Sequence, residues 1–113
     1  MMINIVDDKW GIQLKKGLYE IVILSLLKSK PAYGYEISKS LKEIPGMAIS
    51  EGAIYPILKR MSKNGWITYY WDESLEGPRR KYYEVTTEGV ALLESRLEQY
   101  KSMYEILLSI NKD

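Results

Sequence analysis

The chain of 113 residues is predicted to be a mainly α-helical α+β protein with one small β-hairpin among its helices. Apolar residues recur at helical spacing in four separate segments, which predicts four helices. Between the third and fourth segments, two aromatic-rich runs alternate at strand spacing on either side of a Gly-Pro turn. These two observations define the fold class.

The first helix is expected over about residues 9–28, because Pro31 disfavours helix in the residue before it. Its apolar residues form two stripes on nearly opposite sides. One stripe contains Trp10, Leu14, Leu18 and Ile21, and the other contains Ile12, Tyr19, Ile23 and Leu26. A surface helix of a monomer needs only one apolar face, so this helix is expected to lie between its own domain and a second subunit.

Two shorter helices are expected next. The second covers about residues 33–43 and ends at Pro45-Gly46, and the third extends from an N-cap at Ser50 to about residue 64, just before Gly65. Their inner faces are expected to consist of Tyr33, Ile37, Leu41, Ile44, Ile54, Ile57, Leu58 and Met61.

Pro56 lies several residues inside the third helix, where it removes a backbone hydrogen bond at a cost of roughly 3 kcal/mol in a regular interior. Either the first turn of this helix is tight or irregular, or the helix begins several residues later than Ser50.

The two alternating runs predict a hairpin. Ile67, Tyr69 and Trp71 share one face of the first strand, and Tyr83 and Val85 can pack beside them from the second. Residues 72–79 form the connection.

Thr86 or Thr87 is expected to cap a long final helix. Apolar residues repeat along this helix at alternating spacings of four and three, which predicts the seam of a coiled coil and a dimer interface. The residues of this seam are Leu93, Leu97, Tyr100, Tyr104 and Leu107. One compact unit is therefore expected, with residues 1–86 forming the first domain and residues 87–113 the dimerisation helix.

Several functional classes are excluded or disfavoured by what the chain lacks. It has no cysteine and no histidine, so thiolate and imidazole metal sites and Ser-His or Cys-His catalysis are impossible. It has no glycine-rich phosphate loop, no signal peptide and no apolar run long enough to span a membrane. A cytoplasmic, non-enzymatic protein without a metal or another cofactor is expected.

The order of these elements is that of a winged helix-turn-helix, whose third helix enters the DNA major groove. Opposite its apolar face, this helix presents small residues and cations to solvent, with Tyr55 and Arg60 at the flanks. The outward residues are Gly52, Pro56, Lys59 and Lys63. Small residues permit close approach to the groove, cations can contact phosphates, and Tyr55 can offer a hydroxyl or an apolar edge to a base.

The hairpin would be the wing, lying over the DNA backbone. Gly77 and Pro78 shape its tip, and Arg79, Arg80 and Lys81 supply positive charge, although strand alternation places Arg80 and Lys81 on opposite sides. By itself, the hairpin would be read more simply as a solubilising cluster balanced by Asp72, Glu73 and Glu76. The helices upstream favour the DNA-binding interpretation, even though the whole chain carries a formal net charge of only +1.

Four motifs in this order resemble the PadR family of bacterial transcriptional regulators. They are LKKGLYEIVILSLL at 14–27, YGYEI at 33–37, SEGAIYPILKRMSKNGWI at 50–67 and GPRRKYYEVTTEG at 77–89. The resemblance implies a dimeric winged-helix repressor, often released by a small molecule. The single helix after the wing resembles the short branch of the family, in which that helix and the partner's first helix form the dimer.

The resemblance also implies roles for individual residues. Tyr35 and Lys39 would lie near DNA, Ser50, Gly52, Ala53, Tyr55, Lys59 and Lys63 would belong to the recognition helix, and residues 77–81 would form the wing. Two positions depart from the pattern. Glu51 would face or lie near DNA, where an acid repels phosphate unless it accepts from cytosine, and Ala53 replaces the small hydroxyl residue expected in many relatives.

Some members of the short branch bind flat aromatic drugs between subunits. Trp10, Tyr19, Tyr100 and Tyr104 are the residues expected to line such a cavity, with plain packing of the dimer core as the alternative.

A homodimeric repressor of a two-fold symmetric operator on double-stranded DNA is therefore predicted, with a small aromatic effector as a further partner. The alternatives are a winged-helix protein-interaction module and a ligand-sequestering protein without specific DNA binding.

Overall fold

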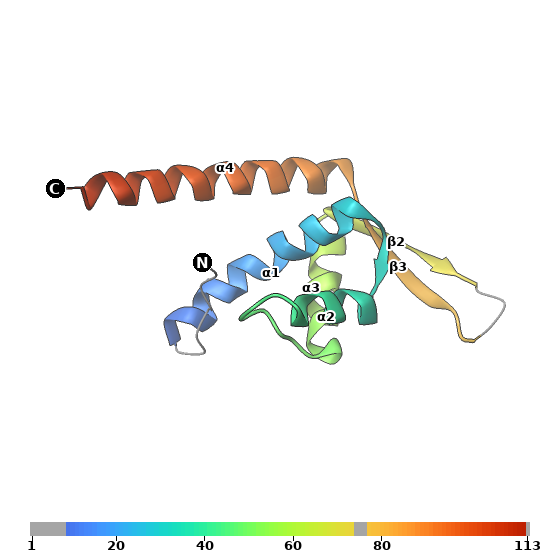
Figure 1. Ribbon diagram of the computed structural model, residues 1–113. Helices are drawn as coiled ribbons and strands as arrows, with labels where there is room; N and C mark the ends of the chain where they lie inside the picture. Colours follow the sequence, from blue (N-terminus) through green and yellow to red (C-terminus); the bar gives the residue numbers. More distant parts are fainter. Residues whose placement is uncertain (1–8, 74–76, 113) are drawn as a thin grey trace.

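The computed structural model describes residues 9–73 and 77–112. In order along the chain, they form helix α1 (Lys9–Ser29), strand β1 (Ala32–Tyr33), helices α2 (Gly34–Lys42) and α3 (Glu51–Lys63), strands β2 (Ile67–Asp72) and β3 (Arg80–Val85), and helix α4 (Thr87–Ile110). The predicted α+β class is confirmed. The molecule measures 63 × 29 × 23 Å, because α4 extends well past the other elements, while the hairpin projects at the opposite end (Figure 1).

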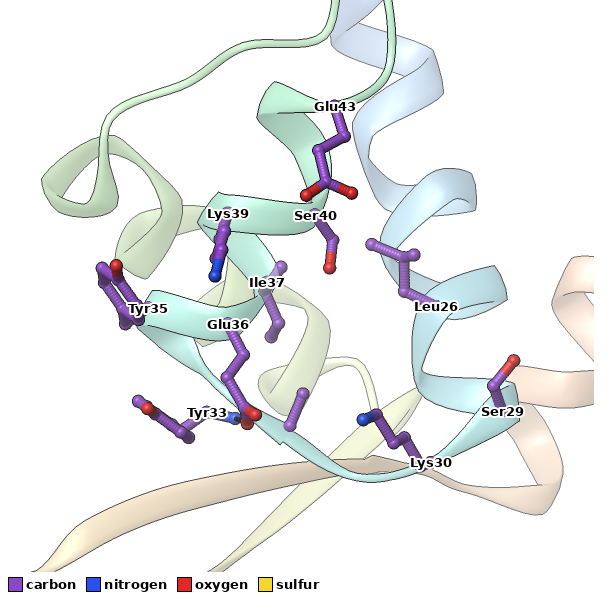
Figure 2. A pocket seen from close by; sticks show the side chains of 11 residues that line it. Leu26, Ser29, Lys30, Tyr33, Tyr35, Glu36, Ile37, Lys39, Ser40 and Glu43 are labelled. Carbon is purple, nitrogen blue, oxygen red and sulfur yellow. Dashed lines mark hydrogen bonds between the residues drawn. The ribbon is translucent and has the colours of Figure 1, made fainter.

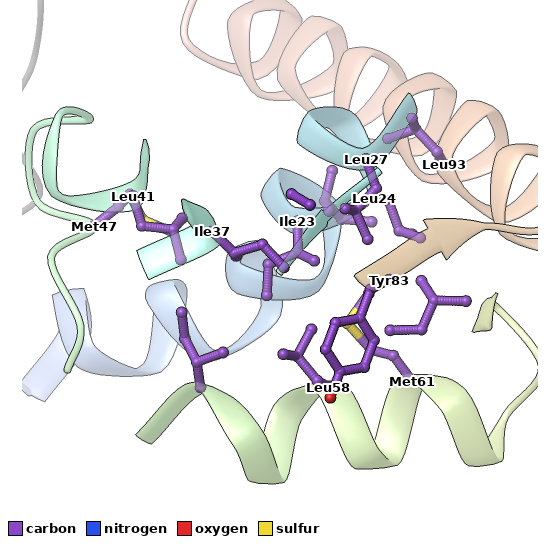
Figure 3. Packing of buried hydrophobic residues seen from close by; sticks show 14 residues of the cluster. Ile23, Leu24, Leu27, Ile37, Leu41, Met47, Leu58, Met61, Tyr83 and Leu93 are labelled. Carbon is purple, nitrogen blue, oxygen red and sulfur yellow. The ribbon is translucent and has the colours of Figure 1, made fainter. Parts of the chain in front are cut away.

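The core lies where α1, α2 and α3 meet the base of the hairpin (Figure 3). Its fully buried aliphatic side chains come from all three helices and β2, and burying each one stabilises the fold by roughly 1.5–3 kcal/mol. The expected inner faces of α2 and α3 are confirmed for the residues that are 0–1 % exposed, namely Ile37, Leu41, Ile54, Leu58 and Met61.

The sheet has three antiparallel strands in the order β1-β3-β2. The expected packing of Tyr83 and Val85 beside the first strand is confirmed, and the register pairs Ile67 with Val85, Tyr69 with Tyr83 and Trp71 with Lys81. The third strand, β1, was not anticipated, because two residues are too few to show alternation. β1 connects the start of α2 to the wing, through the pairing of Tyr33 with Tyr82.

Side chains cap α3 and α4 as their sequences indicate. Ser50 Oγ accepts a hydrogen bond from the Ala53 N–H at 3.2 Å. Thr86, and not Thr87, caps α4, since its Oγ1 accepts from the Gly89 N–H at 3.0 Å. The same hydroxyl donates to the Gly65 carbonyl at 2.6 Å, so one threonine joins the end of α3 to the start of α4.

Pro56 lies inside a continuous α3, so the alternative in which the helix begins later is wrong. The Ala53 N–H also donates to the Ser50 carbonyl at 3.1 Å, which makes the first turn tight. Pro56 has no N–H to offer the Gly52 carbonyl four residues earlier. Gly52 is exposed, so water can hydrogen-bond to that carbonyl instead.

Helix α1 differs along its length. Its C-terminal half is buried in the chain's own core and includes Leu24 and Leu27, which belong to neither predicted stripe. Its N-terminal half leaves Trp10 67 %, Ile12 47 % and Leu14 38 % exposed. One chain therefore provides only one of the two contacts expected for this helix, the contact with its own domain.

The predicted seam of α4 needs one correction. Leu93 is 2 % exposed and belongs to the core of its own chain, so it has no surface left for a partner. The first turns of α4 pack against α1 and against β3 at the hairpin base, which places Leu93 inside. The remaining seam residues are exposed, from Tyr100 at 40 % to Tyr104 at 64 %, and the solvent-exposed seam begins at Leu97.

Candidate nucleic-acid interface

The outer side of α3 is exposed along its whole length, because Ile54, Leu58 and Met61 direct the opposite side into the core. Every residue predicted to face DNA from this helix is solvent-exposed. These residues are Ser50, Gly52, Ala53, Tyr55, Pro56, Lys59 and Lys63. Arg60 instead reaches toward α1, where its Nε lies 3.2 Å from Glu20 Oε2, a partner that sequence periodicity could not identify.

Helix α2 contributes Tyr35 and Lys39, both exposed as predicted. Tyr35 borders two cavities. One, of about 450 Å³, lies between α2 and the C-terminal end of α1, where Glu36 of α2 and the C-cap residue Glu43 face Lys30 and Leu26 (Figure 2). The other lies between α3 and the wing. Tyr35 therefore marks the edge where the two helices and the wing converge.

The wing holds its three cations over aromatic rings. The Arg79 guanidinium carbon lies 4.5 Å from the centre of the Trp71 ring, and that of Arg80 lies 4.7 Å from the centre of Tyr33. Lys81 Nζ lies 3.8 Å from the centre of the Tyr69 ring. Such contacts attract a cation to the ring face and restrict where it points. The predicted division of Arg80 and Lys81 between the two faces is confirmed.

Among the wing residues that the structure describes, Gly77 adopts a φ of +89°, which favours glycine, and Arg79 Nη1 lies 3.5 Å from Glu73 Oε1. This exposed ion pair is weak in water. It can exchange for a phosphate contact at little cost.

The start of α3 and the wing border one cleft of about 440 Å³. Its wall combines wing cations with aromatic and acidic residues from the other elements. The lining consists of Tyr33, Gly34, Tyr35, Glu51, Tyr55, Trp71, Arg79, Arg80, Lys81 and Tyr83. Segments separated by up to 50 positions thus form a single surface.

Tyr55 has a more defined position than its sequence indicates. Its hydroxyl donates a hydrogen bond to Glu51 Oε1 at 3.0 Å. Burial raises the pKa of Tyr55, and the hydrogen bond to the Glu51 carboxylate raises it further. The ring rests on Gly34, where a Cβ would lie 2.7 Å from the tyrosine hydroxyl. Sequence reasoning missed this contact. Its only signal in the sequence was the glycine of the YGYEI motif, which permits another group to approach closely.

Of the four residues predicted to bind an effector, Tyr19 is half-buried against the core, whereas Trp10, Tyr100 and Tyr104 are exposed. Tyr19 donates to the Ala48 carbonyl at 3.3 Å, and the Tyr100 hydroxyl lies 3.5 Å from the Gly17 carbonyl. Trp10 and Tyr104 are 67 % and 64 % exposed. One chain therefore does not assemble them into a single site.

Within residues 9–73 and 77–112, no cluster of three or more His, Cys, Asp or Glu side chains could hold a metal ion. No helix in this part of the chain has the length and apolar character needed to cross a membrane.

Comparison with known proteins agrees with this geometry. A family model described as "Transcriptional regulator PadR-like family" matches residues 23–95. A PadR-like transcription factor from Bacteroides fragilis has a similar structure, with a TM-score of 0.78 and 36 % identity over 91 % of this chain and 99 % of that one. An uncharacterized protein of Lysinibacillus sphaericus is 31 % identical over 94 residues, which are 81 % of this chain and 86 % of the relative.

The structure of Bacillus subtilis PadR in complex with operator DNA is similar with a TM-score of 0.64 and 29 % identity. The similarity covers 71 % of this chain and 46 % of that longer protein. The matched motifs, the winged helix-turn-helix fold and the exposed α3 all agree, and the chain belongs to the PadR-like family of transcriptional regulators.

Proposed function

We propose that the protein is a homodimeric, sequence-specific repressor that acts in the cytoplasm and is released from its operator by a small aromatic effector. The observation that carries the DNA-binding part is the fully exposed outer side of α3 beside the cationic wing. In each subunit, α3 would enter a major groove, and the wing would contact the neighbouring backbone. The similar Bacillus subtilis PadR is known in complex with operator DNA, which supports DNA as the ligand.

Phosphate contacts and base contacts would come from different parts of this surface. Lys59 and Lys63 follow the first turn of α3 at spacings that place them along one side of the helix, where phosphates lie at the groove edge. The first turn, with Ser50, Gly52 and Ala53, would lie deepest. Arg79, Arg80 and Lys81 would add the second set of phosphate contacts.

Helix α4 supports the dimer. Beyond Leu93, apolar residues occupy roughly 200° of its circumference, at 100° per residue. They are Leu97, Tyr100, Met103, Tyr104, Ile106, Leu107, Leu108 and Ile110, each 40–71 % exposed. So large an apolar surface is rare on a monomer. A second copy would cover it with its own α4 and with Trp10, Ile12 and Leu14 of its α1.

The effector would bind where these helices meet. Trp10, Tyr19, Tyr100 and Tyr104 supply aromatic faces suited to a flat aromatic molecule. Release would be a population shift, in which the bound effector favours a spacing of the two α3 helices that no longer fits the operator. A planar aromatic dye that weakens operator binding by the wild-type protein, but not by Trp10→Ala, would support this part of the proposal.

Selection from a random duplex library at near-physiological salt tests the central claim. The expected result is a two-fold symmetric site whose half-sites lie one helical turn, roughly 34 Å, apart. A folded dimer that binds all duplexes equally would contradict sequence-specific regulation and favour the protein-interaction alternative. An asymmetric single half-site would contradict binding as a dimer.

A further inference from the structure

Glu51 occupies the first turn of α3 and lines a cleft whose other charged residues are the wing cations Arg79, Arg80 and Lys81. A carboxylate at this position weakens the electrostatic attraction between α3 and DNA, because it repels the nearby phosphates. Proximity to the helix N-terminus favours a carboxylate by only about 0.3–1 kcal/mol. Helix stabilisation alone therefore gives a modest reason for an acid at this point.

The structure holds this carboxylate in one place. Tyr55, one turn later, donates its hydroxyl to Glu51 Oε1 at 3.0 Å. The ring of Tyr55 is itself seated on Gly34 at the start of α2, where no side chain would fit without displacing it. The direction of Glu51 thus depends on two helices and not on its own rotamer preference.

The hydrogen bond leaves acceptor capacity on the carboxylate. The Tyr55 hydroxyl remains a donor throughout the neutral range, because the ordinary pKa of tyrosine is 10.0 and that of Tyr55 is raised above it. A carboxylate offers about four acceptor positions. One of these positions accepts from Tyr55. The others remain open, because Glu51 is exposed at the end of α3 that would enter the groove.

Base edges in the major groove respond differently to such an acceptor. Cytosine presents an amino group as a donor, whereas guanine and thymine present oxygen or nitrogen acceptors that repel a carboxylate. Adenine presents a donor beside an acceptor. A fixed acceptor therefore favours cytosine most and disfavours guanine and thymine.

We propose that Glu51 is a specificity-determining residue that accepts a hydrogen bond from the amino group of cytosine, and that Tyr55 is its positioning residue. This inference rests on the proposed function, because it requires that α3 enters the major groove. It assigns one base pair in each half-site to one side chain.

The test repeats the duplex selection with Glu51→Ala, Glu51→Gln and Tyr55→Phe beside the wild-type protein. The wild type should select cytosine at one position of each half-site. Glu51→Ala should lower that discrimination by roughly fivefold or more, while keeping or raising affinity for unrelated duplexes. Glu51→Gln should move the preference toward adenine, which pairs with an amide through two hydrogen bonds.

Tyr55→Phe separates positioning from mere packing. It keeps the ring on Gly34 and removes only the hydroxyl, so it should weaken selectivity at the same position by less than Glu51→Ala and leave other positions unchanged. Lys63→Ala is the matched control on α3, and it should lower affinity for all sequences without changing the selected bases.

The outcomes distinguish this inference from the proposed function. If the wild type selects a site and Glu51→Ala selects the same site with uniformly tighter binding, Glu51 only repels phosphate and the inference is wrong while the function stands. If the wild type selects no site, both are wrong.

Discussion

Helices α3 and α4 are both amphipathic, but they differ in what one chain does with their apolar residues. Helix α3 buries Ile54, Leu58 and Met61 completely and exposes small and cationic residues. Helix α4 buries Leu93 and then leaves the rest of its apolar residues exposed, from Leu97 to Ile110 at 71 %. Figure 1 shows the same contrast, with α3 beside the other helices and α4 extending away from them.

The difference shows that the two exposed surfaces have different chemistry. The exposed side of α3 is polar and is stable in water, so it is available to a polar ligand such as DNA. The exposed side of α4 is apolar, and each of its larger side chains, still 40–71 % exposed, would gain roughly 0.6–2 kcal/mol on full burial. The polar surface of α3 is stable without a ligand, whereas the apolar surface of α4 is expected to be covered as soon as a partner chain is present.

Leu97→Asp is expected to have the largest effect. It places a carboxylate in the apolar surface of α4, where burial without a partner is strongly unfavourable. The dimer should dissociate, as measured by sedimentation velocity, and operator affinity should fall with it. Ser102→Asp adds the same charge on the opposite, polar side of α4 and should remain dimeric. An intact Leu97→Asp dimer would place the interface elsewhere.

Leu58→Ala should act on the chain itself. It removes a completely buried side chain of α3 and should lower the free energy of unfolding by about 2–5 kcal/mol, as measured with denaturant. Leu107→Ala is the matched control, because Leu107 is 52 % exposed in one chain. At protein concentrations low enough to give monomers, it should cost far less. If Leu107→Ala lowered the free energy of unfolding of the monomer as much as Leu58→Ala does, this part of α4 would pack within its own chain.

Arg80→Ala should affect DNA binding alone. If Arg80 contacts a phosphate, its loss weakens binding to all sequences about equally and reduces the salt slope by about 1. Lys112→Ala removes a cation beyond the end of α4 and should change neither quantity. A changed base preference in Arg80→Ala would mean that the wing reads bases.

The smallest expected effect concerns pH. Burial raises the pKa of both Tyr55 and Tyr83 above the ordinary value of 10.0. In the unfolded chain these hydroxyls lose protons near pH 10, while the folded chain retains them. The stability they contribute is therefore present below that pH and is lost as pH rises through the folded-state pKa. Urea unfolding at about pH 9 and about pH 11 should show the decrease, and Tyr55→Phe should reduce it.

Much of the fold could be predicted from local pattern. The inner faces of α2 and α3, the cap at Ser50, a threonine cap at residue 86 or 87, and the packing of Tyr83 beside the first strand all follow from periods of 3.6 and 2 residues and from capping chemistry. The family motifs were visible for the same reason, since each lies within one element or one turn. The exposure of the predicted α3 and wing residues follows from those periods as well.

Contacts between distant segments could not be predicted in this way. Strand β1 has no periodicity of its own and exists because Tyr33 pairs with Tyr82. The ion pair of Arg60 with Glu20 spans 40 positions. Leu93 continued a regular heptad, and only the packing of α4 against α1 and β3 assigns it to the core of its own chain.

The sequence by itself determined the approximate extents of the helices, which of their sides are apolar, and which cations a winged helix-turn-helix would present to DNA. Those properties depend on neighbours within a few residues, whose spacing the backbone geometry sets. Only the tertiary structure decided that Glu51, Tyr55 and Gly34 form one assembly beside the wing cations. That arrangement depends on the packing of α2 against α3 and on β1 joining the sheet, and no local period encodes the distance between separate elements.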